Sequence, residues 1–198
     1  FLFDEYTKTA NNTIYTKIMG GGNMAKFYLI RHGEPDYTYG DTHGFIGQGH
    51  DFAPLKEDKI EEVIKTAKDI RLKNAEIIIS SPYTRALQTA SIISKETALD
   101  IVVEPDLREW QPDLTYQYKN VEEMQELLSD YNKNNGIYPK GETRKWEEKE
   151  HLRKRVISVI NKYKEKYNII IIVAHQMAFQ SICDCGDIKP AEIFETNF

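Results

Sequence analysis

One short stretch of the chain places several reactive side chains directly after an apolar run at residues 26–30. Arg31 is a permanent cation whose planar fork of donors binds a phosphate or carboxylate through two bonds. His32, with an ordinary pKa of about 6.5, acts near neutral pH as a nucleophile or proton carrier. Gly33 lets an oxyanion approach the backbone, and Pro35 ends the segment and leaves the cluster in a loop.

Two further apolar runs end in the same kind of chemistry. Residues 77–80 lead into Ser81-Pro82 and then Arg85, and residues 169–173 lead through Ala174 to His175. Ligands of open α/β sheets bind just beyond the carboxyl ends of the strands. We therefore expect four side chains to meet there: Arg31, His32, Arg85 and His175. Two guanidinium groups and two imidazoles around one point suit a phosphate dianion.

Taken together, these motifs resemble those of a known family. The Arg-His-Gly-Glu run at 31–34, the Ser-Pro-x-x-Arg-Ala-x-Gln-Thr-Ala run at 81–90 and the late strand before His175 are similar to motifs of the histidine phosphatase superfamily (phosphoglycerate mutase-like), in the same order. The resemblance covers most of the chain from Met24 onward. It implies that His32 is a phosphoryl-accepting nucleophile and that Arg31, Arg85 and His175 hold the phosphoryl oxygens.

The alternation of helical and strand patterns indicates an α/β fold. Strands are predicted at 26–30, 76–80, 100–104 and 169–173, and helices at 60–70, 83–97, 121–131 and 143–167. Such alternation favours a mainly parallel sheet with helices on both faces, a three-layer α/β/α sandwich. Residues 31–56 are expected to form a loop, and residues 105–141 a small cap beside the site. Because the chain ends soon after a final helix that carries Cys183 and Cys185, we do not expect the terminal strand of longer relatives.

Further stretches resemble the family with departures. Residues 47–55 are similar to its Gln-Gly-x-x-Asp-x-Pro-Leu stretch, which makes Gln48 a candidate substrate contact. Ile46 stands where the family often has an arginine, so one phosphate or substrate contact is expected to be missing. Gln176 follows His175 where the family often has glycine, and we expect it to narrow the pocket or add an amide contact. Residues 139–143 resemble the family's Pro-x-Gly-Glu-Ser turn.

A leaving alkoxide needs a proton donor, ideally a carboxyl group whose pKa is raised by partial burial. Residues 107–110 resemble the family's Leu-x-Glu segment after the third strand, which makes Glu109 the candidate acid. Glu34 and Asp113 are the substitutes. The alternative interpretation of Glu109 is an exposed cap residue paired with Arg108, and Glu34 is also suited to orient an arginine or backbone group near His32.

The composition excludes several classes of function. The 198 residues carry 31 acidic and 26 basic side chains, a net charge of −5, without a long basic run, which argues against nucleic-acid binding. The isoleucine run at 169–172 is too short to span a bilayer. The spacing of Cys183 and Cys185 does not suggest a structural disulfide, and a reducing cytoplasm is the simplest location.

Histidines and acids near the first motif allow a metal-binding alternative. The candidates are His32, His43, His50, Asp51 and His175. They lack a recognised ligand spacing, and two arginines in the site would repel a cation. We therefore expect neither a metal nor another cofactor.

Residues 1–23 are polar and end in a glycine run just before Met24. Since glycine codons are rich in G, this run resembles a bacterial ribosome-binding site read through as protein. We therefore hypothesise that Met24 is the native start and that residues 24–198 form a single domain. The alternative is a genuine but disordered leader, which in either case lies outside the fold.

The sequence thus predicts a metal-independent phosphatase that hydrolyses a phosphomonoester through a phosphohistidine. One alternative is phosphoglycerate mutase-type transfer, although residues 31–55 are compact and lack the family's mutase-type Asn-rich stretch. The other is a non-catalytic module that binds a phosphorylated ligand. The expected substrate is a small phosphorylated molecule or a phosphoprotein, and the sequence leaves the oligomeric state open.

Overall fold

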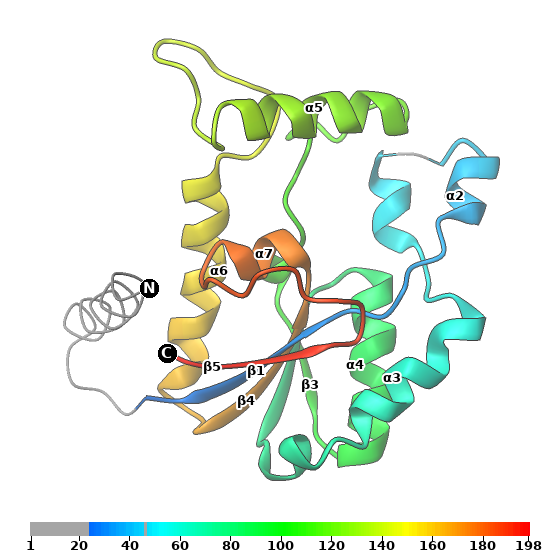
Figure 1. Cartoon of the computed structure of the whole chain (residues 1–198), viewed down its shortest axis with the longest axis vertical. Coiled ribbons are helices and arrows are strands. Elements are labelled where there is room, and N and C mark those ends of the chain that lie inside the picture. Colours follow the sequence, from blue (N-terminus) through cyan, green and yellow to red (C-terminus); the bar gives the residue numbers. More distant parts are fainter. Residues whose placement is uncertain (1–23, 46) are drawn as a thin grey trace, which may run out of the picture.

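The fold was analysed on a computed structural model that describes residues 24–45 and 47–198 (Figure 1). The leader hypothesis at 1–23 and the departure at Ile46 both lie outside the described residues, as does the side chain of Gln48. None of the helices in the described part is long and apolar enough to cross a membrane.

A five-stranded sheet forms the centre of the fold, in the order β3-β2-β4-β1-β5. Its strands are β1 (Lys26–Arg31), β2 (Ile77–Ser80), β3 (Ile101–Val103), β4 (Ile169–Ala174) and β5 (Ile193–Asn197). The first four are mutually parallel, whereas β5 pairs antiparallel with β1. The predicted mainly parallel α/β sheet is therefore confirmed.

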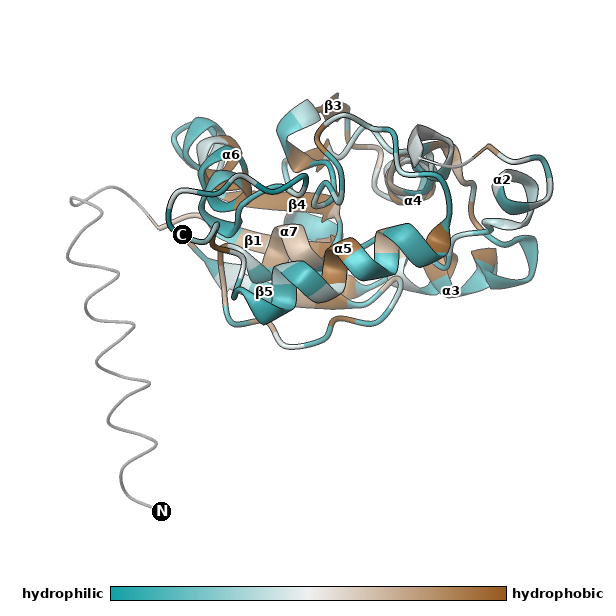
Figure 2. Ribbon diagram, turned by 90° about the horizontal axis from the view of Figure 1, so that it is seen from above, coloured by the Kyte–Doolittle hydropathy of each residue, from teal (hydrophilic) through white to brown (hydrophobic). Residues whose placement is uncertain are grey.

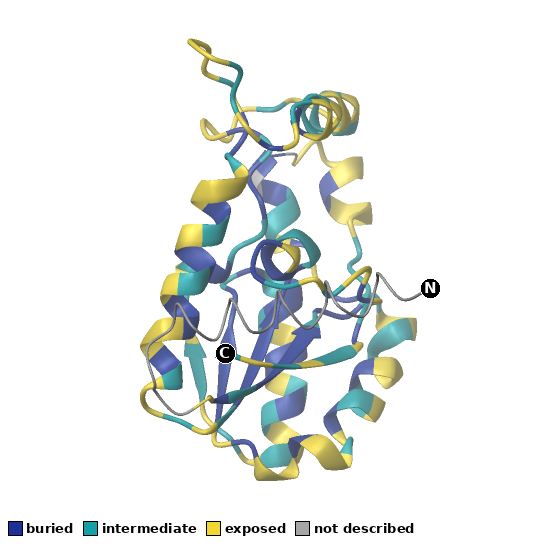
Figure 3. Ribbon diagram, turned by 60° about the vertical axis from the view of Figure 1, so that its left-hand side comes forward, coloured by how far each residue is buried: buried dark blue, intermediate teal, exposed yellow. Residues whose placement is uncertain are grey.

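Both faces of the central strand β4 are buried. In β4, Ile170 and Ile172 belong to one core cluster, whereas Ile171 and Val173 belong to the cluster on the opposite face. Successive side chains of a strand point to opposite faces, so an apolar run such as this one suits a strand covered on both sides. The central strands are correspondingly brown in Figure 2 and dark blue in Figure 3.

Helices cover these two faces and produce the three layers. Helix α6 (Lys149–Lys164) packs on one face through the residues predicted from its periodicity: Leu152, Val156, Val159, Ile160 and Tyr163 are all buried. On the other face lie α3 (Ile60–Ala67) and α4 (Thr84–Thr97), which contribute Ala67, Ala86, Ala90 and Ile93 to the second cluster.

Helix α3 ends before the predicted boundary. Its apolar positions Val63 and Ala67 are buried as expected, but Ile70 lies in the following 3-10 helix η3 (Ile70–Asn74) and is 75% exposed. The side chain of Asp69 accepts a hydrogen bond from the Arg71 amide at 2.9 Å. This cap starts η3 and redirects the chain, which removes Ile70 from the helix face.

Helix α6 begins at Lys149, six residues after the predicted start at 143. The preceding segment is not helical, and in it Trp146 and Glu147 are fully buried. The Trp146 indole N–H donates to Asp130 Oδ2 at 2.8 Å, and Glu147 pairs with Arg155. These contacts fix the segment before the helix. Within the predicted turn at 139–143, the Glu142 amide donates to the Pro139 carbonyl at 2.9 Å.

Two inserted segments lie at the same end of the molecule, beyond the carboxyl ends of the strands (Figure 1). The predicted cap helix is α5 (Val121–Lys133), whose first turn is capped by the Asn120 side chain. Residues 31–56, expected to be a loop, contain helix α2 (Thr38–Thr42) and the 3-10 helix η1 (Gly47–Phe52), and η2 (Glu57–Lys59) follows them.

The C-terminal region differs from the expectation in two ways. Strand β5 is present because its pairing with β1 continues through reciprocal bonds between Ala25 and Phe198, and Phe198 packs edge-on against Phe27 at 5.3 Å. Helix α7 (Gln176–Gln180) ends early, so Cys183 and Cys185 follow the helix and do not lie in it. Both thiols are free and partly exposed.

Candidate active site

The sheet register brings the ends of the three motifs together. Arg31 lies opposite Ala174, and Ser80 lies opposite Val173. The next residue along each strand therefore leaves the sheet at the same edge: His32, Ser81 and His175. The rings of His32 and His175 have centroids 5.0 Å apart. The predicted juxtaposition of the two histidines is present.

The imidazole of His32 has a defined pair of hydrogen-bond partners. Its Nδ1 lies 2.7 Å from the Gly33 carbonyl, which can only accept, so we assign the ring hydrogen to Nδ1. Its Nε2 then accepts from the Arg85 Nε–H at 3.2 Å. Burial first, and the Arg85 charge second, lower the pKa of His32 to about 3. The ring is therefore neutral at physiological pH, with its lone pair on Nε2.

Arg85 lies in the first turn of α4, as predicted, and is buried. Besides its bond to His32, it donates from Nη1 to the His50 carbonyl at 3.0 Å. Its guanidinium also lies over the Tyr83 ring, 5.0 Å from the centroid. Free N–H groups at the start of α4 add to the attraction of this position for an anion.

The motif around Arg85 also holds the neighbouring loops. The Gln88 side chain accepts from the Leu55 amide at 2.7 Å, and Thr89 Oγ1 accepts from the Gly33 amide at 3.0 Å. Two turns of α4 therefore fix both the first motif and the segment that contains η1. Sequence reasoning identified these residues as part of a motif but gave them no role.

Gly33 is required for packing. Its N–H is donated to Thr89, and so it does not face an oxyanion in this arrangement. A Cβ at this position would lie 2.6 Å from Val63 Cγ2 and 3.1 Å from Leu55 Cδ2. The glycine thus allows the loop after β1 to pack directly against α3, which differs from the predicted oxyanion role.

His175 is fully buried beside His32. Its Nε2 lies 2.7 Å from Ser81 Oγ, and its Nδ1 has no hydrogen-bond partner among the described residues. The Tyr83 ring packs against it at 5.0 Å. Burial lowers the pKa of His175 well below its ordinary value, and His32 and Arg85 act in the same direction.

Arg31 and Gln176 both contact the C-terminal loop at residues 186–188. Arg31 Nη1 donates to the Ile188 carbonyl at 2.7 Å and lies 3.6 Å from Asp187 Oδ1. The Gln176 amide donates to the Gly186 carbonyl at 2.7 Å and accepts from the Ile188 amide at 3.0 Å. Gln176 thus holds this loop, and its expected part in the site, narrowing it or adding an amide contact, stays a prediction. The buried Arg31 Nε has no partner among the described residues.

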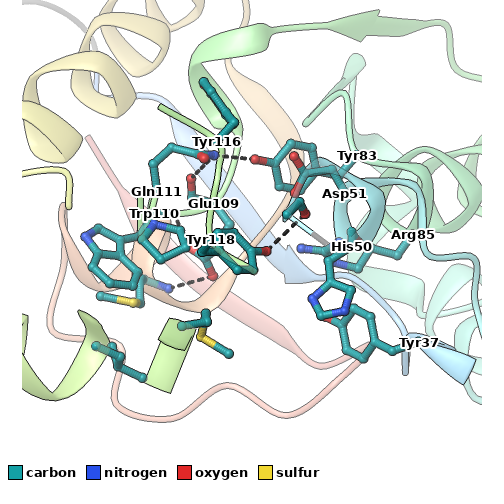
Figure 4. Close-up of a pocket in the computed structure, with 15 residues that line it drawn as sticks. Tyr37, His50, Asp51, Tyr83, Arg85, Glu109, Trp110, Gln111, Tyr116 and Tyr118 are labelled. Carbon is teal, nitrogen blue, oxygen red and sulfur yellow. Dashed lines mark hydrogen bonds between the residues drawn. The ribbon is translucent and has the colours of Figure 1, made fainter. Parts of the chain in front are cut away.

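A cavity of about 210 Å³ is lined by residues of the two inserted segments together with Arg85 and Glu109 (Figure 4), whereas Arg31, His32 and His175 are not among its lining residues. Residues of η1 and α5 contribute to its walls. The cavity is lined by Tyr37, Gly47, His50, Asp51, Tyr83, Arg85, Glu109, Trp110, Gln111, Pro112, Tyr116, Tyr118, Met124, Leu128 and Met177.

Glu109, the predicted acid, lies on this cavity. Its carboxylate accepts hydrogen bonds from the amides of Trp110 (2.8 Å), Ala178 (3.2 Å) and Met177 (3.3 Å). Burial is the largest influence and raises the pKa of Glu109, although these amides oppose it. The alternative pairing with Arg108 is absent, since Arg108 lies 3.3 Å from Asp106 and 4.0 Å from Glu147.

The two substitute acids occupy other environments. Glu34 pairs with Lys56 at 3.3 Å on a partly exposed surface. Asp113 is buried and caps a turn, accepting from the Thr115 amide at 2.8 Å and the Thr115 hydroxyl at 2.7 Å. These bonds lower the pKa of Asp113 despite the opposing effect of burial. Neither lines the cavity.

Asp51 is a second acid on the cavity wall, which sequence reasoning considered only as a metal ligand. Burial raises the pKa of Asp51 to about 6, while Arg85, Tyr83 and His50 lower it. In the sequence it occupies the second variable position of the Gln-Gly-x-x-Asp-x-Pro-Leu pattern, whose own Asp position is Phe52 here. Its position beside Arg85 depends on the fold of η1, which the sequence did not predict.

Of the histidines proposed as alternative metal ligands, His32 and His175 lie together, whereas His43 and His50 have other partners. His43 stacks on Tyr39 at 4.3 Å, and His50 pairs with Asp41 at 2.9 Å. Within residues 24–45 and 47–198, no three His, Cys, Asp or Glu side chains are grouped to hold a metal ion.

Comparison with protein families agrees with this geometry. The model of the histidine phosphatase superfamily (branch 1) matches residues 27–196, which includes all three strand-end motifs. The chain belongs to this superfamily.

Curated sequence relatives match this chain over a limited region. A "Probable phosphoglycerate mutase GpmB" from Proteus mirabilis is 31% identical over 86 residues, 43% of this chain and 38% of that protein. A protein of the same name from Yersinia pestis (strain Pestoides F) is 38% identical over 86 residues, with the same coverage. The matched region thus spans well under half of the length of these curated relatives.

Solved structures share the fold at low sequence identity. A mycobacterial glucosyl-3-phosphoglycerate phosphatase superposes with a TM-score of 0.64 at 16% identity, covering 87% of this chain and 90% of that chain. YhfR from Bacillus stearothermophilus gives 0.65 at 18% identity, covering 86% and 90%. At these identities the likeness concerns the fold alone, and it supports a phosphoglycerate mutase-like α/β architecture.

Proposed function

We propose that this superfamily member is a metal-independent phosphatase that hydrolyses a phosphomonoester through a phosphohistidine on His32. The observation that carries the proposal is the state of the His32 ring. Nδ1 donates to the Gly33 carbonyl, and the pKa is lowered to about 3, so Nε2 keeps an available lone pair. A neutral imidazole of this kind is the form that attacks phosphorus.

Three groups are positioned to bind the phosphoryl oxygens. Arg85 donates to His32 Nε2, so attack requires this bond to break and frees the guanidinium for the incoming oxygens. Ser81 Oγ accepts from the Tyr83 amide at 3.3 Å, and its hydrogen is available to His175 Nε2. We assign this arrangement, which leaves an N–H on the unpartnered His175 Nδ1. That N–H and the unpartnered Arg31 Nε are suited to the remaining charge.

Glu109 is the proposed proton carrier. In the first step the bond between His32 Nε2 and phosphorus forms, the ester P–O bond breaks, and the leaving alkoxide takes a proton from Glu109. In the second step water attacks phosphorus, its proton passes to Glu109, and the bond to His32 breaks. A carboxyl group whose pKa is raised by burial is suited to carry this proton in both directions.

Phosphate release from 4-nitrophenyl phosphate in excess chelator tests this proposal. We expect chelator-resistant turnover that His32→Ala abolishes. His43→Ala is the matched control, because His43 is exposed and stacks on Tyr39 in α2 away from the sheet edge. Turnover that chelator removes, or turnover that survives His32→Ala, would contradict the proposal.

The names of the sequence relatives favour one second candidate, phosphoryl transfer between positions of a phosphoglycerate. Such a mutase would interconvert 2- and 3-phosphoglycerate faster than it releases phosphate. An assay of both products in one reaction separates the two activities. A mutase must also retain its phosphorylated state between turnovers, whereas the hydrolase loses it to water.

A further inference from the structure

We infer that the cavity selects phosphomonoesters whose leaving alcohol carries an uncharged aromatic ring, and that it disfavours leaving groups with a carboxylate. This inference rests on the proposed function and specifies its substrate class. It excludes phosphoglycerates as preferred substrates. Its basis is the distribution of charge and aromatic surface around the cavity.

The charge of the cavity opposes an anionic leaving group. Among the described residues that line it, Arg85 is the only Lys or Arg, and Asp51 and Glu109 contribute two carboxyl groups. The phosphoryl group itself requires Arg85, which lies against His32. A second carboxylate on the substrate would therefore face Asp51 and no remaining lining cation, because Glu109 is protonated as the proposed donor; this is unfavourable in a partly desolvated site.

Aromatic rings form the wall that the leaving group would contact. The His50 ring lies between Tyr37 at 5.0 Å and Tyr118 at 6.4 Å. The Tyr118 hydroxyl donates to the Gly47 carbonyl at 3.0 Å. This hydrogen bond connects the cap at residues 105–141 to η1 and holds the aromatic wall in place. Rings held in place by such contacts bind a flat apolar group without a further loss of conformational freedom.

The wall opposite Arg85 is apolar, so the two ends of the cavity differ in polarity. Trp110 lies across from Arg85 in Figure 4, with Tyr118 between them. Met124 and Leu128 of α5 also line the cavity. A substrate with its phosphoryl group at Arg85 would thus extend its leaving group past Tyr118 toward Trp110 and α5. Thioether and aromatic side chains favour a planar apolar ring there.

Two phosphonates of matched length test this inference by binding alone. 3-Phenylpropylphosphonate and 4-phosphonobutyrate carry a phenyl ring and a carboxylate, respectively, on the same three-carbon chain. Isothermal titration calorimetry on the full chain should give at least tenfold tighter binding of the phenyl compound. Equal or tighter binding of 4-phosphonobutyrate would overturn the inference.

A charge introduced into the cavity provides the second test. Met124→Lys places a cation on the α5 wall and should shift the ratio of the two affinities at least tenfold toward 4-phosphonobutyrate. Gln125→Lys is the matched control, since it adds the same charge on an exposed position of the same helix and should leave the ratio unchanged. An equal shift in both variants would show a general charge effect and overturn the inference.

Turnover assays test the proposed phosphatase activity separately from the inferred ligand class. Turnover is measured on 2-phenylethyl phosphate and on 3-phosphoglycerate. Tight binding of the phenyl phosphonate without hydrolysis of 2-phenylethyl phosphate would contradict the phosphatase and still support the ligand class. Faster hydrolysis of 3-phosphoglycerate would support the phosphatase and overturn the ligand class.

Discussion

Arg155 forms a two-point ion pair with Glu147 beneath the candidate active site, with distances of 2.7 Å from Nε to Oε1 and 2.8 Å from Nη2 to Oε2. Both side chains are buried. The guanidinium also donates to three main-chain carbonyls of the segment that carries the proposed acid: Asp106, Arg108 and Glu109. One buried arginine thus connects α6 to the loop that positions Glu109.

Glu147→Gln is expected to destabilise the protein by about 3 kcal/mol, because it leaves a buried guanidinium without its countercharge. Urea unfolding measures this change. Glu150→Gln is the control: Glu150 is exposed in the first turn of α6, and its 3.9 Å pair with Lys154 should contribute less than about 1 kcal/mol. Similar losses for the two variants would contradict a special role for the buried pair.

Gly33→Ala is expected to cost about 1–3 kcal/mol of folding free energy, since the added Cβ would lie 2.6 Å from Val63 Cγ2. Thermal or urea unfolding gives the value. If the clash is the cause, Val63→Ala should relieve part of it, so the double variant should be more stable than the sum of the single changes predicts. Simple additivity would point to a different origin.

The buried His32 predicts a loss of stability in mild acid. Its pKa is about 3 in the folded protein against 6.5 in the unfolded chain, so between these values the unfolded state binds more protons. Stability therefore rises with pH across this window, and the contribution lost at pH 5 is about 2 kcal/mol. The free energy of unfolding measured at pH 7.5 and pH 5 should fall less in His32→Asn than in the wild type. An equal fall would show that His32 is protonated in the folded state.

Glu109→Gln should slow the hydrolysis of alkyl phosphates far more than that of 4-nitrophenyl phosphate, by about 10²–10⁴-fold against a small change. A 4-nitrophenolate departs without a proton, whereas an alkoxide needs one. Asp51→Asn, which alters the other carboxyl group on the cavity, is the comparison variant and should slow both substrates alike. If Asp51→Asn shows the selective loss instead, the proton donor is Asp51.

The sequence predicted the features that depend on local pattern and on strand ends. The isoleucine runs indicated buried strands, and the rule for parallel sheets then placed His32 and His175 together. The start of α4 and the position of Arg85 in its first turn followed from Pro82 and the helical pattern. These features require little knowledge of distant contacts.

Contacts between distant segments account for the features that the sequence did not predict. The hydrogen bonds of Gln176 with residues 186–188 and the partner of the Gly33 amide, 56 residues away, left no trace in the local pattern. Strand β5 depends on the open edge of β1, and the late start of α6 depends on the burial of Trp146. Asp51 reaches the cavity only because η1 folds against Arg85.

Trapping of the covalent intermediate tests the central claim most directly. The full chain is mixed with 4-nitrophenyl phosphate, quenched in alkali within milliseconds, digested and analysed by mass spectrometry. The account predicts a phosphoryl group on the peptide that contains His32, stable in alkali and lost in acid, and absent from His32→Asn. Steady turnover with no phosphorylated peptide, or with the phosphoryl group on another residue, would contradict it.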